Sequence, residues 1–409
     1  MLYRILKVLV GFGLQVFYRK IHISGLEHIK KDRPQLIASN HPNGFIEPLV
    51  MACFFPKPLN FLVRGDVFEK KWLKPILEAT YQIPVFRFRD GFSKMRENQA
   101  SMSSSIEVLL KGQNLLIFAE GGTESIKRLR GLQKGLPRIA FSVLEQNHNL
   151  DLEILPVGIN FTYPTVFNSE VMLKIGAPIR VKDYFELYRN DKRQAYDQLT
   201  ERIYNEMLLN VVHLETDEDE QLFEKTMPIF REPKPNVSVL VYNDVTLQKE
   251  IRVAKMISDA TNDQKQKVSE LLAGQKDTRK FQQFPSSILR YLVIIIGFLP
   301  ALMGFLIHLL PILVAVNFTK VKVKQKEFRA SILFVVFLVN VLILYLFLIP
   351  LVCIIFHIPW YYIFVCAILG LFAKFYYDFV TFTDFSMGVR DHENTKRSLK
   401  QSIVQLMNG

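Results

Sequence analysis

His41 and Glu47 are the two residues whose types and spacing could do chemistry together. The apolar run Leu36–Ala38 ends in Ser-Asn-His-Pro-Asn-Gly, and Glu47 follows His41 by six positions. Pro42 lacks a backbone donor and Gly44 tolerates unusual backbone angles, so we expect a loop at the end of a strand. A histidine on such a loop can act as a general base that a nearby carboxylate orients. A single pair of this kind is more often structural than catalytic, so other residues must support the interpretation.

The segments that would position this pair alternate between two patterns from residue 20 to about residue 182. Short runs rich in β-branched and aromatic residues predict strands at Lys20–Ser24, Gln35–Ser39, Leu59–Arg64, Ile83–Phe86, Asn114–Ala119, Leu152–Phe161 and Val171–Ile175. Apolar residues at helical spacing predict helices at Met95–Lys111 and Leu136–Asn147. This alternation is typical of α/β proteins. We therefore predict a mixed, mostly parallel sheet that is flanked by helices.

Three further stretches follow the histidine loop. In the second stretch, Gln82–Arg89, a strand end precedes two cations. The third, Leu115–Ser125, reads Leu-Leu-Ile-Phe-Ala-Glu-Gly-Gly-Thr-Glu-Ser, and Lys134 follows it. The fourth, Ile154–Ile159, reads Ile-Leu-Pro-Val-Gly-Ile. Each stretch is a weak signal alone, but the four in this order and at this spacing are specific.

Together the four stretches resemble the glycerophospholipid acyltransferase superfamily, which acylates lysophosphatidate or glycerol-3-phosphate. The resemblance covers roughly residues 15–180. The Gly-Gly form of the third stretch and the hydrophobic C-terminal region are most similar to the branch of yeast-type glycerol-3-phosphate acyltransferases and related bacterial membrane proteins.

The resemblance implies roles for individual residues. His41 would deprotonate an acceptor hydroxyl, which attacks an acyl thioester, while Glu47 orients the imidazole. Arg87 and Arg89 would bind phosphate through their planar, permanently charged guanidinium groups. The other substrate-binding residues that it implies are Glu120, Gly121, Gly122, Arg128, Lys134 and Pro156. It implies no metal and no cofactor, with acyl-CoA or acyl carrier protein (acyl-ACP) as co-substrate. Gly121 and Gly122 would admit the acceptor, and Pro156 would shape the acyl pocket.

Three features depart from the family pattern. The acid is Glu47 instead of Asp, and five residues separate it from His41 instead of four. Two residues six positions apart on one helix would not share a face. We therefore expect His41 to stay on the loop, with the longer side chain of Glu47 closing the gap. Ala119 replaces a proline, and Glu124 stands where many members have a phosphate-binding arginine. Phosphate binding would then shift to other cations, which could also face lipid headgroups: Arg87, Arg89, Lys127, Arg128, Arg130, Lys134 or Arg138.

Composition favours a membrane protein with anionic partners. The chain has 409 residues, a formal net charge of +12, 49% hydrophobic residues and 33 phenylalanines. A basic chain suggests nucleic acid, an anionic membrane or phosphorylated substrates. The apolar content argues against nucleic acid. Cys53, Cys353 and Cys366 show no metal or disulfide spacing, and we expect no cleavable signal peptide.

The predicted domains are an interfacial membrane helix (1–19), a catalytic domain (20–235), a charged helical segment (236–287), a membrane domain (288–385) and a cytoplasmic tail (386–409). Arg4 and Lys7 of the first helix would reach lipid phosphates, although this helix could instead be a buried part of the soluble domain. The membrane domain is predicted to hold a re-entrant hairpin (291–319) and two helices (330–356 and 359–381).

Charge predicts the orientation of the membrane domain. The loop between the apolar runs carries five cations, Lys320, Lys322, Lys324, Lys326 and Arg329. The positive-inside rule places such a loop in the cytoplasm. We expect an integral membrane protein whose catalytic domain also faces the cytoplasm. The re-entrant hairpin would keep the basic loop and the catalytic domain on the same side of the membrane.

The leading functional hypothesis is O-acylation of glycerol-3-phosphate or lysophosphatidate in phospholipid synthesis. The expected partners are the acyl donor, the glycerol-phosphate or lysophospholipid acceptor and membrane lipids, without nucleic acid. One alternative is acylation of another lysolipid or an aminolipid. Another is an inactive lipid-binding membrane scaffold, which the altered His–acid spacing would favour.

Overall fold

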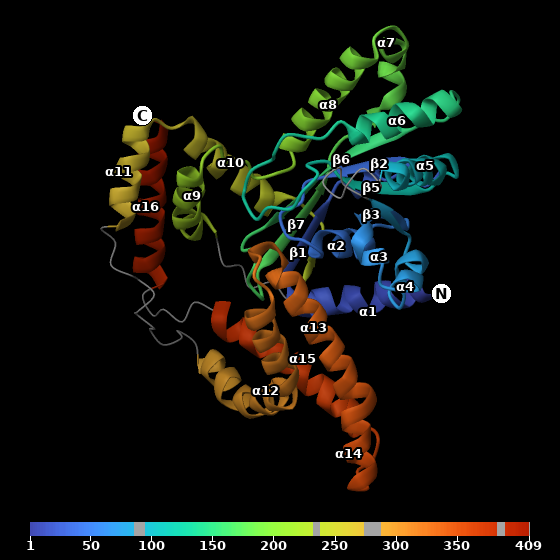
Figure 1. Cartoon of the computed structure of the whole chain (residues 1–409). Coiled ribbons are helices and arrows are strands. Elements are labelled where there is room, and N and C mark those ends of the chain that lie inside the picture. Colours follow the sequence, from blue (N-terminus) through green and yellow to red (C-terminus); the bar gives the residue numbers. More distant parts are fainter. Residues whose placement is uncertain (86–94, 232–237, 274–287, 383–388, 409) are drawn as a thin grey trace. The chain divides into compact units, whose positions relative to one another are not determined.

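Figure 1 shows the computed structural model of the chain, which describes residues 1–85, 95–231, 238–273, 288–382 and 389–408. The chain forms two compact units. The first comprises Met1–Val212 with Leu240–Leu247, and the second comprises His213–Val239 with Gln248–Gly409.

The first unit is built on one nine-stranded sheet, with β4-β3-β5-β2-β6-β7-β1-β9 as its order and β8 paired to β6. Its strands are β1 (Lys20–Ser24), β2 (Gln35–Ser39), β3 (Leu59–Arg64), β4 (Gln82–Val85), β5 (Asn114–Phe118), β6 (Glu153–Phe161), β7 (Glu170–Ile175), β8 (Ile179–Arg180) and β9 (Leu240–Val241). Among the described pairings, β7 and β8 run antiparallel to β6, and the rest are parallel. The predicted mixed, mostly parallel sheet is therefore confirmed.

Helices flank this sheet on both sides (Figure 1). They are α1 (Leu2–Phe17), α2 (Ile46–Phe54), α3 (Gly65–Phe68), α4 (Lys74–Ala79), α5 (Met95–Leu110), α6 (Gly135–Gln146), α7 (Phe185–Asn190) and α8 (Lys192–Leu208), with short 3₁₀ turns at Leu26–His28 and Val181–Tyr184. In Figure 1, α1 to α4 lie on the side of the sheet opposite α6, α7 and α8.

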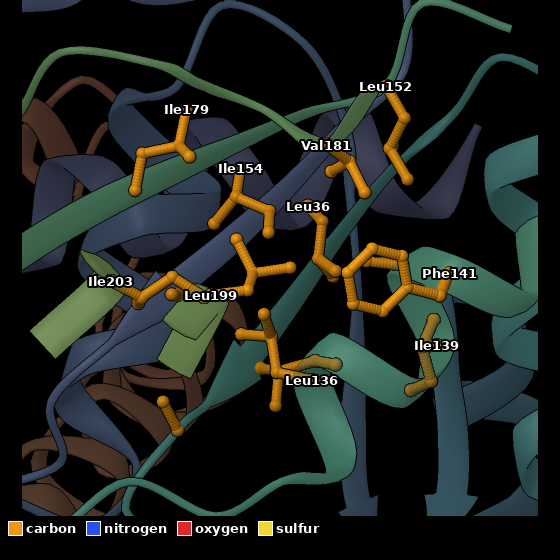
Figure 2. Packing of buried hydrophobic residues seen from close by; sticks show 14 of the residues in the cluster. Leu36, Leu136, Ile139, Phe141, Leu152, Ile154, Ile179, Val181, Leu199 and Ile203 are labelled. Atoms are coloured by element: carbon orange, nitrogen blue, oxygen red, sulfur yellow. The ribbon is translucent and has the colours of Figure 1, made fainter. Parts of the chain in front are cut away.

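The core lies between the central strands and the helices that follow them. Leu36 of β2 and Ile154 of β6 are fully buried and belong to one cluster with Phe141 of α6 and Leu199 and Ile203 of α8 (Figure 2). Every residue of β2 and β6 is buried. Strands covered on both faces are expected to be mostly apolar. Both strands are, although they also bury polar side chains: Gln35, Ser39, Glu153 and Asn160. The loops that leave their ends therefore start from a rigid platform.

Helix α1 buries one face and exposes the other. Tyr3 donates a hydrogen bond to the carbonyl of Ala52 in α2 at 3.3 Å. Lys7 Nζ donates to the carbonyl of Phe55 at 2.6 Å, and Gly11 is buried beside Cys53. Lys7 thus caps the end of α2 instead of reaching lipid phosphates, contrary to expectation, because the unpaired carbonyls at a helix C-terminus attract a cation.

The second unit is helical. Its helices are α9 (Asp217–Phe230), α10 (Val245–Asp259, which begins in the first unit), α11 (Asn262–Ala273), α12 (Ile288–Lys322), α13 (Arg329–Ile343), α14 (Ile349–Ile355), α15 (Tyr362–Phe382) and α16 (Val389–Asn408). A 3₁₀ turn at Lys326–Phe328 precedes α13, and a π-helical segment, η7 (Leu344–Leu348), joins α13 to α14. Within the described residues, three segments are long and apolar enough to cross a membrane: Tyr291–Lys322, Lys326–Ile355 and Tyr362–Thr381.

A re-entrant hairpin was predicted over 291–319, and how this stretch enters a membrane stays a prediction. This stretch is one helix, α12, with Pro300 and Pro311 inside it. Proline removes one helical hydrogen bond, but apolar helices tolerate it where neighbouring helices pack against them. Gly304 lies so close to α15 that an added Cβ would stand 2.0 Å from the carbonyl oxygen of Leu369. Helix α12 is thus continuous and packs closely on α15 at Gly304.

Candidate active site

Three of the four predicted stretches meet at one edge of the sheet. His41 follows β2, which lies between β5 and β6. Ser39 of β2 pairs with Phe118 of β5 and Val157 of β6, and these strands are parallel. Loops at the carboxyl ends of parallel strands converge, and such edges commonly hold ligand sites in α/β proteins. The loops after β2 and β5 therefore share one site.

Asn40 fixes the point at which the chain leaves the sheet. Its side-chain oxygen accepts a hydrogen bond from the backbone N–H of Ile159 at 2.8 Å. Its amide nitrogen donates to the carbonyl of Ile159 at 2.9 Å. The side chain thus satisfies both backbone groups of a buried position in β6 while the backbone turns away towards His41. No role was predicted for Asn40, although its position directly before the candidate base was a signal.

His41 stays on the loop, and Glu47 lies in the first turn of α2. Nδ1 of His41 is 3.6 Å from Oε1 of Glu47, which also accepts a hydrogen bond from the backbone N–H of Asn43. Two different elements thus supply the pair, so the six-position separation does not keep the side chains apart. Catalytic hydrogen bonds are often long in proteins without substrate and tighten when substrate binds.

The environments of the two side chains differ. The Glu47 side chain is 0% exposed, and this burial raises the pKa of its carboxyl while the neighbouring His41 imidazole opposes the rise. The His41 side chain is 16% exposed, with Nδ1 buried. Its ring stacks on Phe118, with centroids 3.8 Å apart and planes at 11°. The imidazole is held between an aromatic face and a buried acid, and its other edge is accessible.

The carboxylate of Glu120 is hydrogen-bonded within the site and is not a free carboxylate. Its Oε2 accepts a hydrogen bond from Nη2 of Arg130 at 2.7 Å, and its Oε1 accepts from the backbone N–H of Arg130 at 3.2 Å. The backbone N–H of His41 lies 3.4 Å from Oε2. The buried carboxylate therefore ties the loop after β5 to the loop that carries His41. The partner Arg130 was not assigned this role from the sequence.

The two predicted glycines differ, because the backbone requires glycine at Gly121 but not at Gly122. Gly121 has a φ of +71°, and an added Cβ would meet Cγ of Gln133 at 2.8 Å. This turn therefore requires glycine. At Gly122 the nearest atom to an added Cβ would be Nη1 of Arg130, at 3.6 Å, which is an ordinary contact.

The predicted cations do not all gather at the site. Lys134 pairs with Asp197 of α8, and both side chains are about half exposed. Lys127 donates to the carbonyls of Phe161 and Thr162, at 3.0 and 3.3 Å. Arg128 is half-buried in the same loop. The predicted phosphate ligands Arg87 and Arg89 lie outside the described residues.

Pro156 lies inside the sheet. It is buried in β6, in register with Ala38 of β2, and its carbonyl accepts a hydrogen bond from Gly176 N–H at 2.8 Å. Ala38 precedes His41 by three residues, so Pro156 lies within the sheet and not at the edge that carries His41. Its role in an acyl pocket stays a prediction.

Comparisons with known proteins match the part of the chain that contains His41 and Glu47. A family model described as "Acyltransferase" matches residues 20–160. An uncharacterized acyltransferase of Schizosaccharomyces pombe is 32% identical over 102 residues, which are 24% of this chain and 15% of that protein. Glycerol-3-phosphate O-acyltransferase 1 of Saccharomyces cerevisiae is 29% identical over 90 residues, 21% of this chain and 12% of that protein. The chain thus matches less than a sixth of the length of either curated relative.

A solved structure was also found, the 1-acyl-sn-glycerophosphate acyltransferase PlsC of Thermotoga maritima. It is 20% identical, covers 49% of this chain and 79% of its own, and has a TM-score of 0.36.

Proposed function

We propose that the chain is a membrane-bound O-acyltransferase of glycerolipid synthesis, and the match of the acyltransferase family model to residues 20–160 supports this. It moves a fatty acyl chain from acyl-CoA or acyl-ACP to glycerol-3-phosphate or lysophosphatidate. The observation that carries the proposal is the His41–Glu47 pair at the accessible end of β2.

The proposed reaction needs one base and one leaving group. The exposed edge of His41 accepts the proton of the acceptor hydroxyl while that oxygen bonds to the thioester carbonyl carbon. The carbon–sulfur bond then breaks, and the departing thiolate takes the proton from the imidazolium. Glu47 holds Nδ1 protonated and stabilises the positive charge that develops on the ring.

The acceptor's phosphate is assigned to cations that were predicted from the sequence. We keep Arg87, Arg89 and Arg128 as the proposed phosphate ligands. Lys134 is a weaker choice because its exposed pair with Asp197 already neutralises it. Gly121, Gly122 and Glu120 shape the loop, and the acyl chain is proposed to pass near Pro156.

The exposed face of α1 supports contact with a lipid surface. Ile5, Val8 and Phe12 are 52%, 74% and 53% exposed, and their spacing of three and four puts them on one side of the helix. The opposite side packs on α2. An amphipathic helix of this kind lies in the headgroup region with its apolar face in the acyl chains. We therefore keep the proposal of an interfacial helix at residues 1–19.

We propose that the second unit is embedded in the membrane and that the catalytic domain faces the cytoplasm, where acyl-CoA and acyl-ACP are found. Helix α12, once it crosses, delivers the basic loop Lys320–Arg329 to the opposite side, against the positive-inside rule. A cysteine introduced at Lys324 and labelled in sealed vesicles tests whether α12 crosses the membrane or returns to the catalytic side. Labelling from the catalytic side alone means that α12 does not cross.

Product analysis tests the acceptor. The purified chain is offered labelled acyl-CoA or acyl-ACP with glycerol-3-phosphate and lysophosphatidate side by side, and mass spectrometry identifies the ester. We expect one of the two phosphate monoesters to be acylated. Preference for a phosphate-free or amine acceptor would overturn the phosphate assignment. Specific binding of lysophosphatidate without any transfer would instead indicate a lipid-binding scaffold.

A further inference from the structure

The connection between β6 and β7, residues 162–169, exposes three large apolar side chains, which we call the apolar tip. Tyr163, Val166 and Phe167 are 39%, 50% and 40% exposed. The backbone N–H of Val166 donates to the carbonyl of Tyr163 at 3.2 Å, so a turn brings the three residues together. Exposed apolar residues are ordinary when they are scattered singly, but a group of them marks an interaction surface.

The loop that carries the apolar tip is fixed by hydrogen bonds and ring packing. Thr162 N–H donates to the carbonyl of Glu170 at 3.0 Å, and Glu170 N–H donates to the hydroxyl of Thr162 at 2.9 Å. Asn168 N–H donates to the carbonyl of Phe17, the last residue of α1, at 3.0 Å. The ring of Phe167 packs edge-on to Phe17, with centroids 5.4 Å apart. The tip is therefore held in place against the end of α1.

The same loop contacts the loop that carries His41. The side-chain amide of Asn43 donates to the carbonyl of Pro164 at 2.5 Å, while the backbone N–H of Asn43 donates to Oε1 of Glu47. Phe45, two residues after Asn43, is also exposed. Whatever covers the apolar tip therefore lies next to the loop that holds the His41–Glu47 pair.

A lipid bilayer is the occupant that the observations favour. The tip adjoins the end of α1, whose other face exposes apolar side chains of its own. Among the described residues, the same chain has three segments able to cross a membrane, so the chain that carries the tip can also enter a bilayer. Lys127 Nζ donates to the carbonyls of Phe161 and Thr162, which places a cation at the base of the loop. Aromatic side chains and cations are typical of the membrane–water interface.

We propose that the apolar tip inserts into an anionic bilayer, at the boundary between headgroups and acyl chains, beside the loop that carries His41. The formal net charge of +12 favours an anionic surface. The kinetic consequence rests on the proposed function, but the membrane contact itself does not. A lipid acceptor or an acyl chain then passes between the bilayer and the His41 loop without entering bulk water. The tip is a second membrane contact, distinct from α1.

A spin label at residue 166 tests the insertion in the full chain. Cys53, Cys353 and Cys366 are first replaced by alanine, and Val166→Cys is labelled and reconstituted into vesicles of phosphatidylcholine and phosphatidylglycerol. Electron paramagnetic resonance then compares collisions of the label with oxygen, which enters lipid, and with a water-soluble nickel chelate. We expect oxygen collisions to dominate. A label that collides mainly with the nickel chelate would overturn the proposal.

Leu209→Cys is the matched control. Leu209 is also apolar and is 63% exposed, but it follows α8, which lies on the side of the sheet opposite α1 (Figure 1). Its label should collide mainly with the nickel chelate. Equal lipid exposure of the two labels would overturn the assignment of the contact to the tip. Spectral broadening at residue 166 that disappears on dilution with unlabelled chain would show that a second copy covers the tip, which would also overturn it.

The kinetic test places a charge in the tip. Val166 is assigned to no step of the reaction, and Val166→Thr keeps the shape of the side chain without a charge. For lysophosphatidate presented in vesicles, we expect Val166→Asp to raise KM about tenfold, because burial of a valine side chain favours binding by about this factor or more. Val166→Thr should change KM less than Val166→Asp does. A KM for Val166→Asp equal to the native value would overturn the passage of lipid beside the tip.

The two experiments separate the membrane contact from the proposed function. A lipid-exposed label at residue 166 in a chain that transfers no acyl group supports the contact, and only the proposed function then fails. A water-exposed label in an active acyltransferase overturns the contact, and the proposed function stands.

Discussion

Nδ1 of His41 lies 3.6 Å from Oε1 of Glu47, although one residue belongs to the loop after β2 and the other to the first turn of α2. The carboxylate is fully buried, whereas the imidazole keeps one edge accessible. A buried acid behind a partly exposed base is the arrangement that general-base catalysis requires. The position of Glu47 at the N-terminus of a helix also favours its negative charge.

Glu47→Gln should lower activity and raise stability. Without a carboxylate the imidazole loses its orientation and its stabilising charge, and we expect kcat to fall by about 10–100-fold. Burial raises the pKa of Glu47, so the folded chain holds this proton more tightly than the unfolded chain. The resulting stability is present below the unfolded pKa and is lost as pH rises through the folded pKa.

At pH 8 the buried charge therefore destabilises the native chain, and Glu47→Gln removes it. Thermal unfolding should show a higher Tm for the variant at pH 8 and a shrinking difference as pH falls towards 4. A lower Tm for the variant at pH 8 would show that the charge is instead compensated by its partners.

Asn40→Ala should destabilise the site through the backbone of β6. It leaves both the N–H and the carbonyl of Ile159 without their partner. We expect a loss of about 1–3 kcal/mol in the free energy of unfolding, with lower kcat because the His41 loop is released. Asn147→Ala, at an exposed position, is the control. Equal effects of the two substitutions in denaturant titrations would rule out the special role of Asn40.

Arg130→Met should destabilise the chain because it leaves the charge of Glu120 buried without its main partner. Hydrogen bonds to charged groups contribute about 1.5–3 kcal/mol, and we expect a loss of this size. The double variant Glu120→Gln/Arg130→Met should be more stable than Arg130→Met alone, since no charge is then left unpaired. Unfolding measurements that find the double variant to be the less stable would contradict this account of the pair.

Gly304→Ala should weaken the packing of α12 on α15. The new Cβ would meet a backbone oxygen, that of Leu369, at 2.0 Å, and overpacking of this kind destabilises by about 1–3 kcal/mol. Gly297→Ala is a graded control, because its Cβ would meet the ring of Tyr376 at 2.9 Å, and a side chain can shift. Thermal unfolding in detergent should rank Gly304→Ala below Gly297→Ala, and the reverse order would contradict the packing.

The sequence was most informative where local pattern and tertiary environment agree. Strand β2 was predicted with its observed bounds because a buried apolar run ends at a loop-forming Asn-His-Pro-Asn-Gly. The two-residue strands β8 and β9 are too short to leave a pattern. The hairpin over 291–319 was predicted from the charge of the loop that follows it, whereas the structure has one helix, α12, over this stretch.

The part of the site that was predicted consists of residues close together in the sequence. Four short stretches were enough to indicate the acyltransferase family, whose model matches residues 20–160. His41 and Glu47 could be paired because they are close in sequence. Asn40 bonds to Ile159, 119 positions away, and Glu120 to Arg130 across a loop. The first contact depends on the order of strands in the sheet and the second on the path of an irregular loop, and local patterns encode neither.

The most direct test of the central claim is the rate of ester formation by His41→Ala. General-base catalysis contributes about 10²–10⁴-fold, so the variant should be slower by that factor while it still purifies with membranes and unfolds cooperatively. His148→Ala, at an exposed histidine of the same unit, should retain the native rate. A rate for His41→Ala within a few-fold of the native chain would contradict the assignment of His41 as the base.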